Sequence, residues 1–209
     1  MTILLLIRHA SNDYIKENRL AGLTPGVHLN EQGKSEADAL ARRLAPISLH
    51  AIYSSPLERA RETADAIAQC QKLTVQIRHD LAEVDVGEWT GKPIKELGET
   101  DAWRRMLAQP IGFQFPGGEC IERIQGRMVK AIDAIVIAHP NQIVAIVSHA
   151  DPIKIALAYY LEMDGNQFDR LAVDPASVSV LIFGERGPVL FRLNDSGALP
   201  SFEPEKKDA

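Results

Sequence analysis

Two apolar segments of the chain each end in a histidine with a polar neighbour. Residues 3–7 are apolar, and Arg8 and His9 follow them directly. Residues 142–147 form a second, largely apolar run, which is followed by Ser148 and His149. A neutral imidazole can attack phosphorus, and a guanidinium offers a planar fork of donors to phosphate oxygens. A lone histidine at such a place is ordinary, but two of them at two strand ends predict a site for phosphoryl chemistry.

Arg59 is a further cation whose position needs an explanation. The stretch SSPLERARETADAIA predicts a helix with Ser55 as its N-cap and Pro56 at its first helical position. A cation in the first turn opposes the helix dipole, which favours anions at that end. Arg59 is therefore either a solvated surface arginine or, together with the helix N-terminus, part of a site for an anion.

Glu83 is a candidate general acid. It lies in the stretch LAEVDVGEWTG, where apolar neighbours would raise the pKa of the carboxyl group toward neutrality. On this pattern alone, Asp85 and Glu88 are equally available for the role. Trp89 lies between two glycines, and it either walls a pocket or belongs to the core.

Short elements that alternate along the chain must position these residues. Apolar runs predict strands at 3–7, 51–53, 73–77, 142–147, 177–183 and 189–193. Helical periodicity predicts helices at 31–45, 55–68, 94–108, 120–138 and 152–161. This alternation is typical of an α/β three-layer sandwich, with a mostly parallel central sheet, helices on both faces and at least one antiparallel strand. Ligands bind beyond the carboxyl ends of the strands in such sheets, where both histidines are expected.

Composition limits the kind of protein that this chain can be. It has 209 residues, of which 45% are hydrophobic and 24% charged, as in an ordinary globular protein. We expect one domain over residues 1–195, with a lid-like segment at 84–118, and a disordered tail at 196–209. The net charge of −5 argues against nucleic acid as a partner, and no segment is long enough to span a membrane.

The cellular compartment is predicted from the first apolar run and from the cysteines. The run that ends at Arg8 is too short and too poorly flanked for a signal peptide. Cys70 and Cys120 have no metal-ligand spacing, and the sequence alone leaves a disulfide between them open. We expect a cytoplasmic protein with two free cysteines.

Five segments resemble, in the same order, the motifs of the histidine phosphatase superfamily, whose members have the phosphoglycerate-mutase-like fold. The segments are LLLIRHA, SSPLERARETA, LAEVDVGEWTG, PGGEC and IVSHAD. The resemblance implies that His9 is a nucleophile that becomes phosphohistidine, and that Glu83 protonates the leaving oxygen and then activates water. It also implies that Arg8, Arg59 and His149 bind the phosphoryl oxygens, and that His149 takes part in catalysis. Because these groups supply positive charge, no metal and no other cofactor is expected.

The chain departs from the family pattern near the expected pocket. Ala10 stands where the family has glycine, and Ile15 stands where it often has asparagine. One phosphate contact is therefore lost, or is taken over by Asn12 or Ser11. The stretch NRLAGLTPGVHL follows the family only loosely, but its residues are expected near the pocket. The candidate substrate contacts are Ser11, Asn12, Arg19, Leu23, Thr24 and Trp89.

The resemblance implies a phosphomonoester hydrolase that acts on a small phosphorylated metabolite. Val84 and Val86 stand where cofactor-dependent phosphoglycerate mutases carry arginine and tyrosine, which argues against a mutase. The stretch WRR, with Arg104 and Arg105, is similar to a mutase substrate segment and keeps the mutase as an alternative. A catalytically inactive relative that binds phosphorylated ligands is a further alternative. As partners we expect the small substrate, no nucleic acid and no membrane, and a homodimer is left open.

Overall fold

The inner strands of the central sheet consist of apolar residues that are buried on both faces. In the computed structural model, which describes residues 1–197, the strands are β1 (Thr2–Arg8), β2 (Ala51–Ser54), β3 (Val75–Ile77), β4 (Ile143–Ser148), β5 (Val178–Gly184) and β6 (Gly187–Asp195). They lie in the order β3-β2-β4-β1-β5-β6. Strands β3, β2, β4 and β1 are parallel, whereas β5 and β6 are antiparallel to their neighbours. The predicted sheet, mostly parallel with an antiparallel hairpin, is confirmed.

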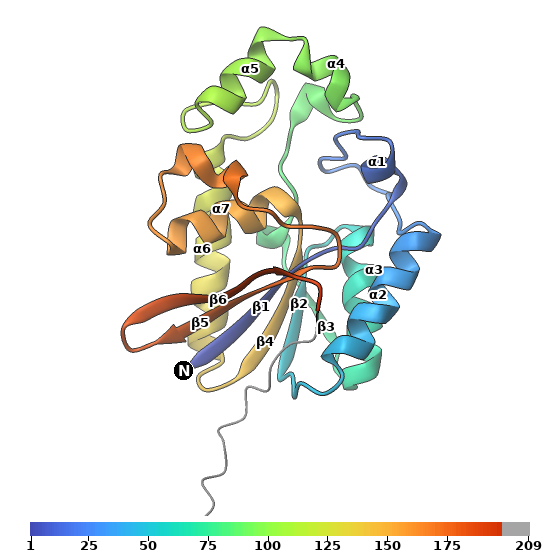
Figure 1. Cartoon of the computed structure of the whole chain (residues 1–209), viewed down its shortest axis with the longest axis vertical. Coiled ribbons are helices and arrows are strands. Elements are labelled where there is room, and N and C mark those ends of the chain that lie inside the picture. The colour runs from blue at the N-terminus through green and yellow to red at the C-terminus, as the bar shows by residue number, and fades with distance from the viewer. Residues whose placement is uncertain (198–209) are drawn as a thin grey trace, which may run out of the picture.

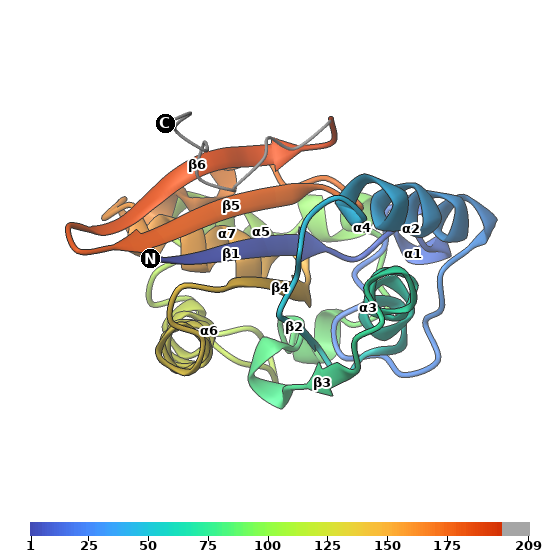
Figure 2. The same cartoon turned by 90° about the horizontal axis from the view of Figure 1, so that it is seen from below.

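Helices cover both faces of this sheet. They are α1 (Asp13–Lys16), α2 (Glu31–Leu44), α3 (Glu58–Gln71), α4 (Ile94–Gly98), α5 (Asp101–Ala108), α6 (Ile121–Ala138) and α7 (Ala150–Tyr160). Successive side chains of a strand point to opposite faces. In β1, Leu5 and Ile7 pack in the cluster with α2 and α3, whereas Leu4 and Leu6 pack in the cluster with α6 and α7. Seen along the layers, α6 lies on one side of the sheet and α2 and α3 on the other, which confirms the three-layer sandwich (Figure 2).

The strand register brings distant parts of the chain to one level of the sheet. Arg8, the last residue of β1, is the register partner of Ser148, the last residue of β4. Ser54, the last residue of β2, is paired with Val147. The three parallel strands therefore end together, and the residues that follow them emerge side by side. Helices α1, α4 and α5 lie beyond this end of the sheet, opposite the N-terminus (Figure 1).

The segment 84–118 crosses this same end and is tied to the loop after α1. The helix predicted at 94–108 is two helices, because the chain turns at residues 99–100 and the Thr100 hydroxyl caps α5. Three backbone hydrogen bonds join the two segments: Leu20 N to Lys92 O, Gly91 N to Leu20 O, and Ile94 N to Asn18 O. The lid that the sequence suggests for 84–118 is thus anchored to residues 18–20.

The predicted capping of α3 by Ser55 is wrong. The helix begins at Glu58, and its N-cap is Leu57, which makes no side-chain capping bond. Ser55 instead continues β2, since its backbone N–H donates to the Val147 carbonyl. Its hydroxyl is thereby directed toward the end of β4. A tertiary contact has replaced the local capping bond that the sequence favours.

Two expectations concern the ends of the chain and the membrane. Beyond Gly197 the predicted disordered tail lies outside the described residues. Within residues 1–197, no helix combines the length and the apolar character that crossing a bilayer requires.

The packing of α2 against the loop after β1 gives a first prediction. A Cβ atom on Gly33 would lie 1.9 Å from the Ser11 carbonyl oxygen, whereas one on Gly126 would meet no atom of residues 1–197 within 4 Å. Both glycines are inside helices, so alanine at either site gains about 0.5–1 kcal/mol of helix propensity. We expect Gly126→Ala to raise Tm by about 2 °C and Gly33→Ala to lower it by about 5 °C, because overpacking outweighs propensity. Thermal unfolding followed by circular dichroism measures both, and a Gly33→Ala variant as stable as Gly126→Ala would contradict the close packing.

Candidate active site

His9 is positioned by the end of β1 and by its own backbone neighbour. It is buried, and its backbone N–H donates to the Ser148 carbonyl. Its ring Nδ1 lies 2.7 Å from the Ala10 carbonyl oxygen, which can only accept a hydrogen bond. The hydrogen-bond network therefore assigns the proton to Nδ1 and leaves the lone pair on Nε2. Burial and the charges of Arg59 and Arg8 lower the pKa of His9 well below its usual value, so the ring is neutral.

Two guanidinium groups lie beside this ring with donors that are not satisfied by the protein. Arg59 is completely buried, and its Nη2 donates to the Gly22 carbonyl at 2.8 Å. Arg8 Nη1 donates to the Val173 carbonyl at 2.8 Å. Arg59 Nε, Arg59 Nη1 and Arg8 Nε are buried and have no hydrogen-bond partner among the described residues. The charge of Glu83 acts on both guanidinium groups but does not satisfy these donors. Buried donors without an acceptor are costly, so these nitrogens indicate an anion between them.

His149 stands next to His9 and is fixed by Ser55. It is fully buried, and the centroids of the two imidazole rings lie 5.0 Å apart. Ser55 Oγ lies 2.8 Å from His149 Nε2, and it also accepts a hydrogen bond from the Leu57 backbone N–H. Nε2 is the one acceptor that we find for the Ser55 hydroxyl within residues 1–197. Ser55 therefore donates to Nε2, and the proton of His149 is on Nδ1, 3.6 Å from Glu83 Oε2.

Glu83 has the environment of a general acid. Its Oε1 accepts a hydrogen bond from the Val84 backbone N–H at 2.9 Å. Burial, and secondarily the negative charge of Asp151, raise the pKa of Glu83 to about 7, although the two arginines oppose this shift. Burial lowers the pKa of His149 well below its usual value. A protonated carboxyl group and two neutral imidazoles therefore coexist near neutral pH.

A buried ion pair that the sequence did not reveal holds the loop that carries Glu83. Arg127 Nη1 donates to the carbonyls of Asp80 and Ala82, and its Nη2 donates to the carbonyl of Glu83. Arg127 also forms an ion pair with Glu119 at 2.9 Å. One side chain of α6 thus fixes the backbone that leads to the acid, up to the carbonyl of Glu83 itself. Glu119 lies in the PGGEC stretch, so this motif is the sequence feature that could have indicated the ion pair.

These side chains converge on one cavity of about 280 Å³ at the carboxyl end of the sheet. Arg8, His9, Arg59 and Glu83 line it, and His149 contacts the His9 ring without lining it. The segment 84–118 contributes Val84, Val86 and Ile94 to its wall. The remaining lining residues are Asn12, Tyr14, Ile15, Asn18, Arg19, Leu20, Ala21, Gly22, Ala150, Asp151 and Lys154. Of these, Tyr14, Asn18, Asp151 and Lys154 are polar residues that no sequence pattern singled out.

The candidate substrate contacts divide into two groups. Asn12 and Arg19 line the cavity, as does Ile15. Asn12 is buried, and its side-chain oxygen accepts the Ile15 backbone N–H, which leaves its amide N–H groups without a partner among the described residues. Arg19 donates to the Gly91 carbonyl and to Glu17.

Ser11, Leu23, Thr24 and Trp89 do not line the cavity. The Ser11 hydroxyl and backbone N–H both bind Glu36 on α2, so this side chain turns away. Leu23 is exposed, and Thr24 donates to the Ala21 carbonyl. Trp89 is buried among the aromatic rings of Trp103, Phe113 and Phe115, and of its two alternatives the core is correct.

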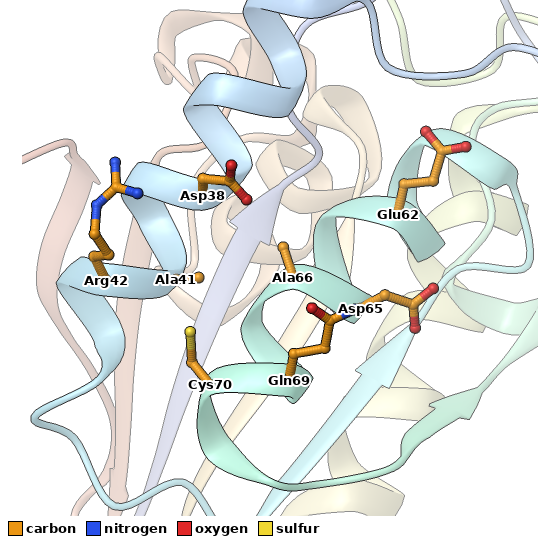
Figure 3. A pocket seen from close by; sticks show the side chains of 8 residues that line it. All are labelled: Asp38, Ala41, Arg42, Glu62, Asp65, Ala66, Gln69 and Cys70. Atoms are coloured by element: carbon orange, nitrogen blue, oxygen red, sulfur yellow. The ribbon is translucent and has the colours of Figure 1, made fainter.

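A groove between α2 and α3 has about 350 Å³ but the wrong charge for a phosphate (Figure 3). Asp38 and Arg42 reach over it from α2, and Glu62 and Asp65 reach over it from α3. Three carboxylates against one guanidinium would repel an anion. The smaller cavity, with its buried cations, is therefore the site of interest.

His9, Glu83 and His149 also resemble a metal-binding set in their residue types. Their candidate ligand atoms lie within 4.8 Å of one another. One nitrogen of each imidazole is already engaged in a hydrogen bond. A metal cation would in addition face the charges of Arg8 and Arg59, which already act on both rings. The cluster therefore fits an anion better than a metal ion.

Comparisons with known proteins agree with the motifs. The model of the histidine phosphatase superfamily (branch 1) matches residues 4–196. Phosphoserine phosphatase 1 of Hydrogenobacter thermophilus is 34% identical over 211 positions, which cover 100% of both chains. A 2,3-bisphosphoglycerate-dependent phosphoglycerate mutase of Thermoplasma acidophilum is 30% identical over 87% of each chain. A structure of a phosphoserine phosphatase mutant of Entamoeba histolytica in complex with phosphoserine has a TM-score of 0.87 at 26% identity, and the match covers 96% of this chain and 100% of that one. The family that the five motifs resemble is thereby confirmed, and this chain belongs to the histidine phosphatase superfamily.

Proposed function

We propose that the chain is a metal-independent phosphomonoester hydrolase that acts on a small phosphorylated metabolite through a phosphohistidine intermediate. One observation carries this proposal. The lone pair of His9 Nε2 belongs to a neutral ring beside two guanidinium groups whose buried donors have no partner within the described part of the chain. A nucleophile and an anion-binding site thus share one cavity.

In the first step, the phosphoryl group binds to the free donors of Arg8, Arg59 and His149. His9 Nε2 attacks phosphorus, and the bond between phosphorus and the leaving oxygen breaks. Protonated Glu83 gives its proton to that oxygen, so the leaving group departs as a neutral alcohol. The guanidinium groups stabilise the negative charge of the equatorial oxygens in the transition state.

In the second step, a water molecule attacks the phosphohistidine. Glu83, now a carboxylate, takes a proton from this water, and the bond between phosphorus and Nε2 breaks. Inorganic phosphate leaves, and His9 and protonated Glu83 are restored. We propose that residues 84–118 act as a lid during this cycle, a role that their anchoring to residues 18–20 supports.

The alternatives are less well supported. In a mutase, arginine and tyrosine would stand at positions 84 and 86, but here Val84 and Val86 present apolar surface to the cavity. Arg104 binds Asp101 and the Glu99 carbonyl, and it does not line the cavity. An inactive phosphate-binding relative would not need a carboxyl group with a raised pKa, and measured turnover separates it from an enzyme. The cytoplasmic location and the homodimer stay predictions.

Relatives define the substrates to try first. The Hydrogenobacter relative is named a phosphoserine phosphatase, and Entamoeba phosphoserine phosphatase has been solved with phosphoserine and with 3-phosphoglyceric acid. We therefore propose a panel that includes phosphoserine, 3-phosphoglycerate, sugar phosphates and p-nitrophenyl phosphate, with formation of 2-phosphoglycerate followed as the sign of a mutase.

Replacing the nucleophile tests the proposal directly. We expect His9→Ala to lower kcat on p-nitrophenyl phosphate by about a thousandfold or more, because no other group supplies the phosphoryl acceptor. His79→Ala, at an exposed histidine outside the cavity, is the matched control and should keep wild-type turnover. Substantial turnover by a folded His9→Ala variant would contradict the assignment.

The pH profile tests Glu83. Because its pKa is raised to about 7, Glu83 is a proton donor below that pH and loses this role above it. For alkyl phosphates we expect kcat to fall about tenfold per pH unit on the alkaline side. Glu83→Gln should remove this limb and lower the rate of the phosphorylation step, measured in a single turnover, about a hundredfold on glycerol phosphate, but far less on p-nitrophenyl phosphate, whose leaving group scarcely needs a proton. Glu88→Gln is the control, and it should keep the fall in rate on the alkaline side. If that fall persists in Glu83→Gln, Glu83 is excluded as the general acid.

Chelation tests the absence of a metal from the mechanism. The positive charge comes from Arg8 and Arg59, so dialysis against EDTA should leave kcat/KM unchanged. A loss of activity that one added divalent metal restores would contradict the proposed metal independence.

A further inference from the structure

The first two turns of α7 place two opposite charges at the wall of the active-site cavity. The helix begins at Ala150, directly after His149, and Asp151 and Lys154 both line the cavity. They lie three positions apart, which places them on the same side of the helix. Neither residue bonds to the reacting atoms in the chemical steps described above, although the charge of Asp151 helps to raise the pKa of Glu83.

The two residues bind each other only weakly. Lys154 Nζ lies 3.4 Å from Asp151 Oδ1, a longer contact than the usual charge-assisted hydrogen bond of about 2.8 Å. Half of the Asp151 side chain and one fifth of the Lys154 side chain remain exposed, at 51% and 20%. No further hydrogen bond of the Lys154 ammonium to another described residue is present. Each charged group therefore retains capacity for a ligand.

The position of Asp151 and Lys154 relative to Glu83 shows which part of a substrate these two residues would contact. Asp151 lines the same cavity as Glu83 and Arg8, and its charge favours the protonated form of both groups. Glu83 delivers its proton to the leaving oxygen, and the substituent on that oxygen must therefore lie near Asp151. Lys154 follows one helical turn later along the same wall.

The charges of the cavity disfavour a substituent that carries a single net charge. A phosphoryl dianion neutralises Arg8 and Arg59. Arg19 is already engaged with the Gly91 carbonyl and Glu17. Apart from Glu83, the charged groups that remain among the described lining residues are Lys154 and Asp151, which pair only weakly with each other. A substituent with a single charge would bring a like charge against one of them.

We propose that Lys154 and Asp151 select a leaving group that carries both a carboxylate and an ammonium, as in the phosphate ester of a hydroxyl-bearing amino acid. Lys154 pairs with the carboxylate, and Asp151 pairs with the ammonium. In an α-amino acid the carboxylate and the ammonium are bonded to the same carbon atom. Their short separation matches that of Lys154 Nζ and Asp151 Oδ1, which lie 3.4 Å apart. This specificity rests on the proposed phosphomonoesterase function and names its substrate class.

Four phosphate esters separate the two contacts. O-phosphoserine has both charges, phosphoethanolamine lacks the carboxylate, 3-phosphoglycerate has a hydroxyl in place of the ammonium, and glycerol 3-phosphate has neither charge. The variants are Lys154→Met and Asp151→Asn, which remove one charge each with little change of size. Lys130→Met, at an exposed position of α6, is the matched control.

Ratios of kcat/KM between two esters in the same variant give the readout, because changes in the common chemistry cancel, including a shift of the Glu83 pKa. We expect Lys154→Met to lower the ratio of phosphoserine to phosphoethanolamine by about tenfold or more, the loss typical of one charge-assisted hydrogen bond. Asp151→Asn should lower the ratio of phosphoserine to 3-phosphoglycerate similarly. Lys154→Arg should keep the first ratio near wild type, and Lys130→Met should keep both.

Two results would overturn the proposal. One is a wild-type enzyme that hydrolyses glycerol 3-phosphate as well as phosphoserine, and the other is a set of ratios that neither variant changes. Either leaves the phosphomonoesterase function standing, because hydrolysis itself has been observed. If the wild type hydrolyses none of the four esters, calorimetry of the same esters on His9→Ala, with and without Lys154→Met or Asp151→Asn, replaces the rates. If the affinity ratios change in the two variants as predicted for kcat/KM, the charge recognition is upheld while the hydrolase function fails. If neither variant changes the affinity ratios, both proposals are rejected.

Discussion

The buried guanidinium nitrogens that lack a hydrogen-bond acceptor within residues 1–197 are the constraint on which the site depends. Arg59 lies completely inside the protein, and the buried Nε atoms of Arg59 and Arg8 find no acceptor in the described structure. Carbonyl oxygens of Gly22 and Val173 satisfy one nitrogen of each guanidinium, but a dipole compensates a buried charge only in part. The remaining free-energy cost of burying the two guanidinium groups is removed when an anion binds. The affinity of the site for a phosphoryl group therefore results from the positions of these two side chains.

The same burial sets the protonation states that the chemistry needs. Desolvation and the neighbouring cations keep His9 and His149 neutral, whereas desolvation and the charge of Asp151 keep Glu83 protonated up to about pH 7. A nucleophile without a proton and an acid with one can thus exist at the same pH. Since these shifts have a common physical origin, opening the cavity to water would weaken the nucleophile and the acid together.

The sequence predicted the parts of the site that strand ends and local motifs determine. Apolar runs located β1 and β4, and the rule that ligands bind at the carboxyl ends of parallel strands placed His9 and His149 together. The prediction for Ser55 was wrong, because a capping signal is local whereas the hydrogen bond to His149 depends on the register of β2 and β4. Ser11 and Trp89 were likewise directed by tertiary partners, Glu36 and an aromatic cluster, that no spacing rule reveals. Asp151 and Lys154 went unnoticed because their place in the cavity depends on α7 beginning at Ala150, two residues before the predicted start.

The nitrogen that carries the phosphoryl group is the most direct test of the site that we describe. Wild-type enzyme would be quenched in alkali during turnover of p-nitrophenyl phosphate, digested, and examined by peptide mass spectrometry and by NMR of the isolated phosphohistidine. We predict a single modified site, Nε2 of His9, because Nδ1 is held by the Ala10 carbonyl. A phosphoryl group on Nδ1 of His9, on His149, or on no residue while phosphate is being released would contradict the arrangement.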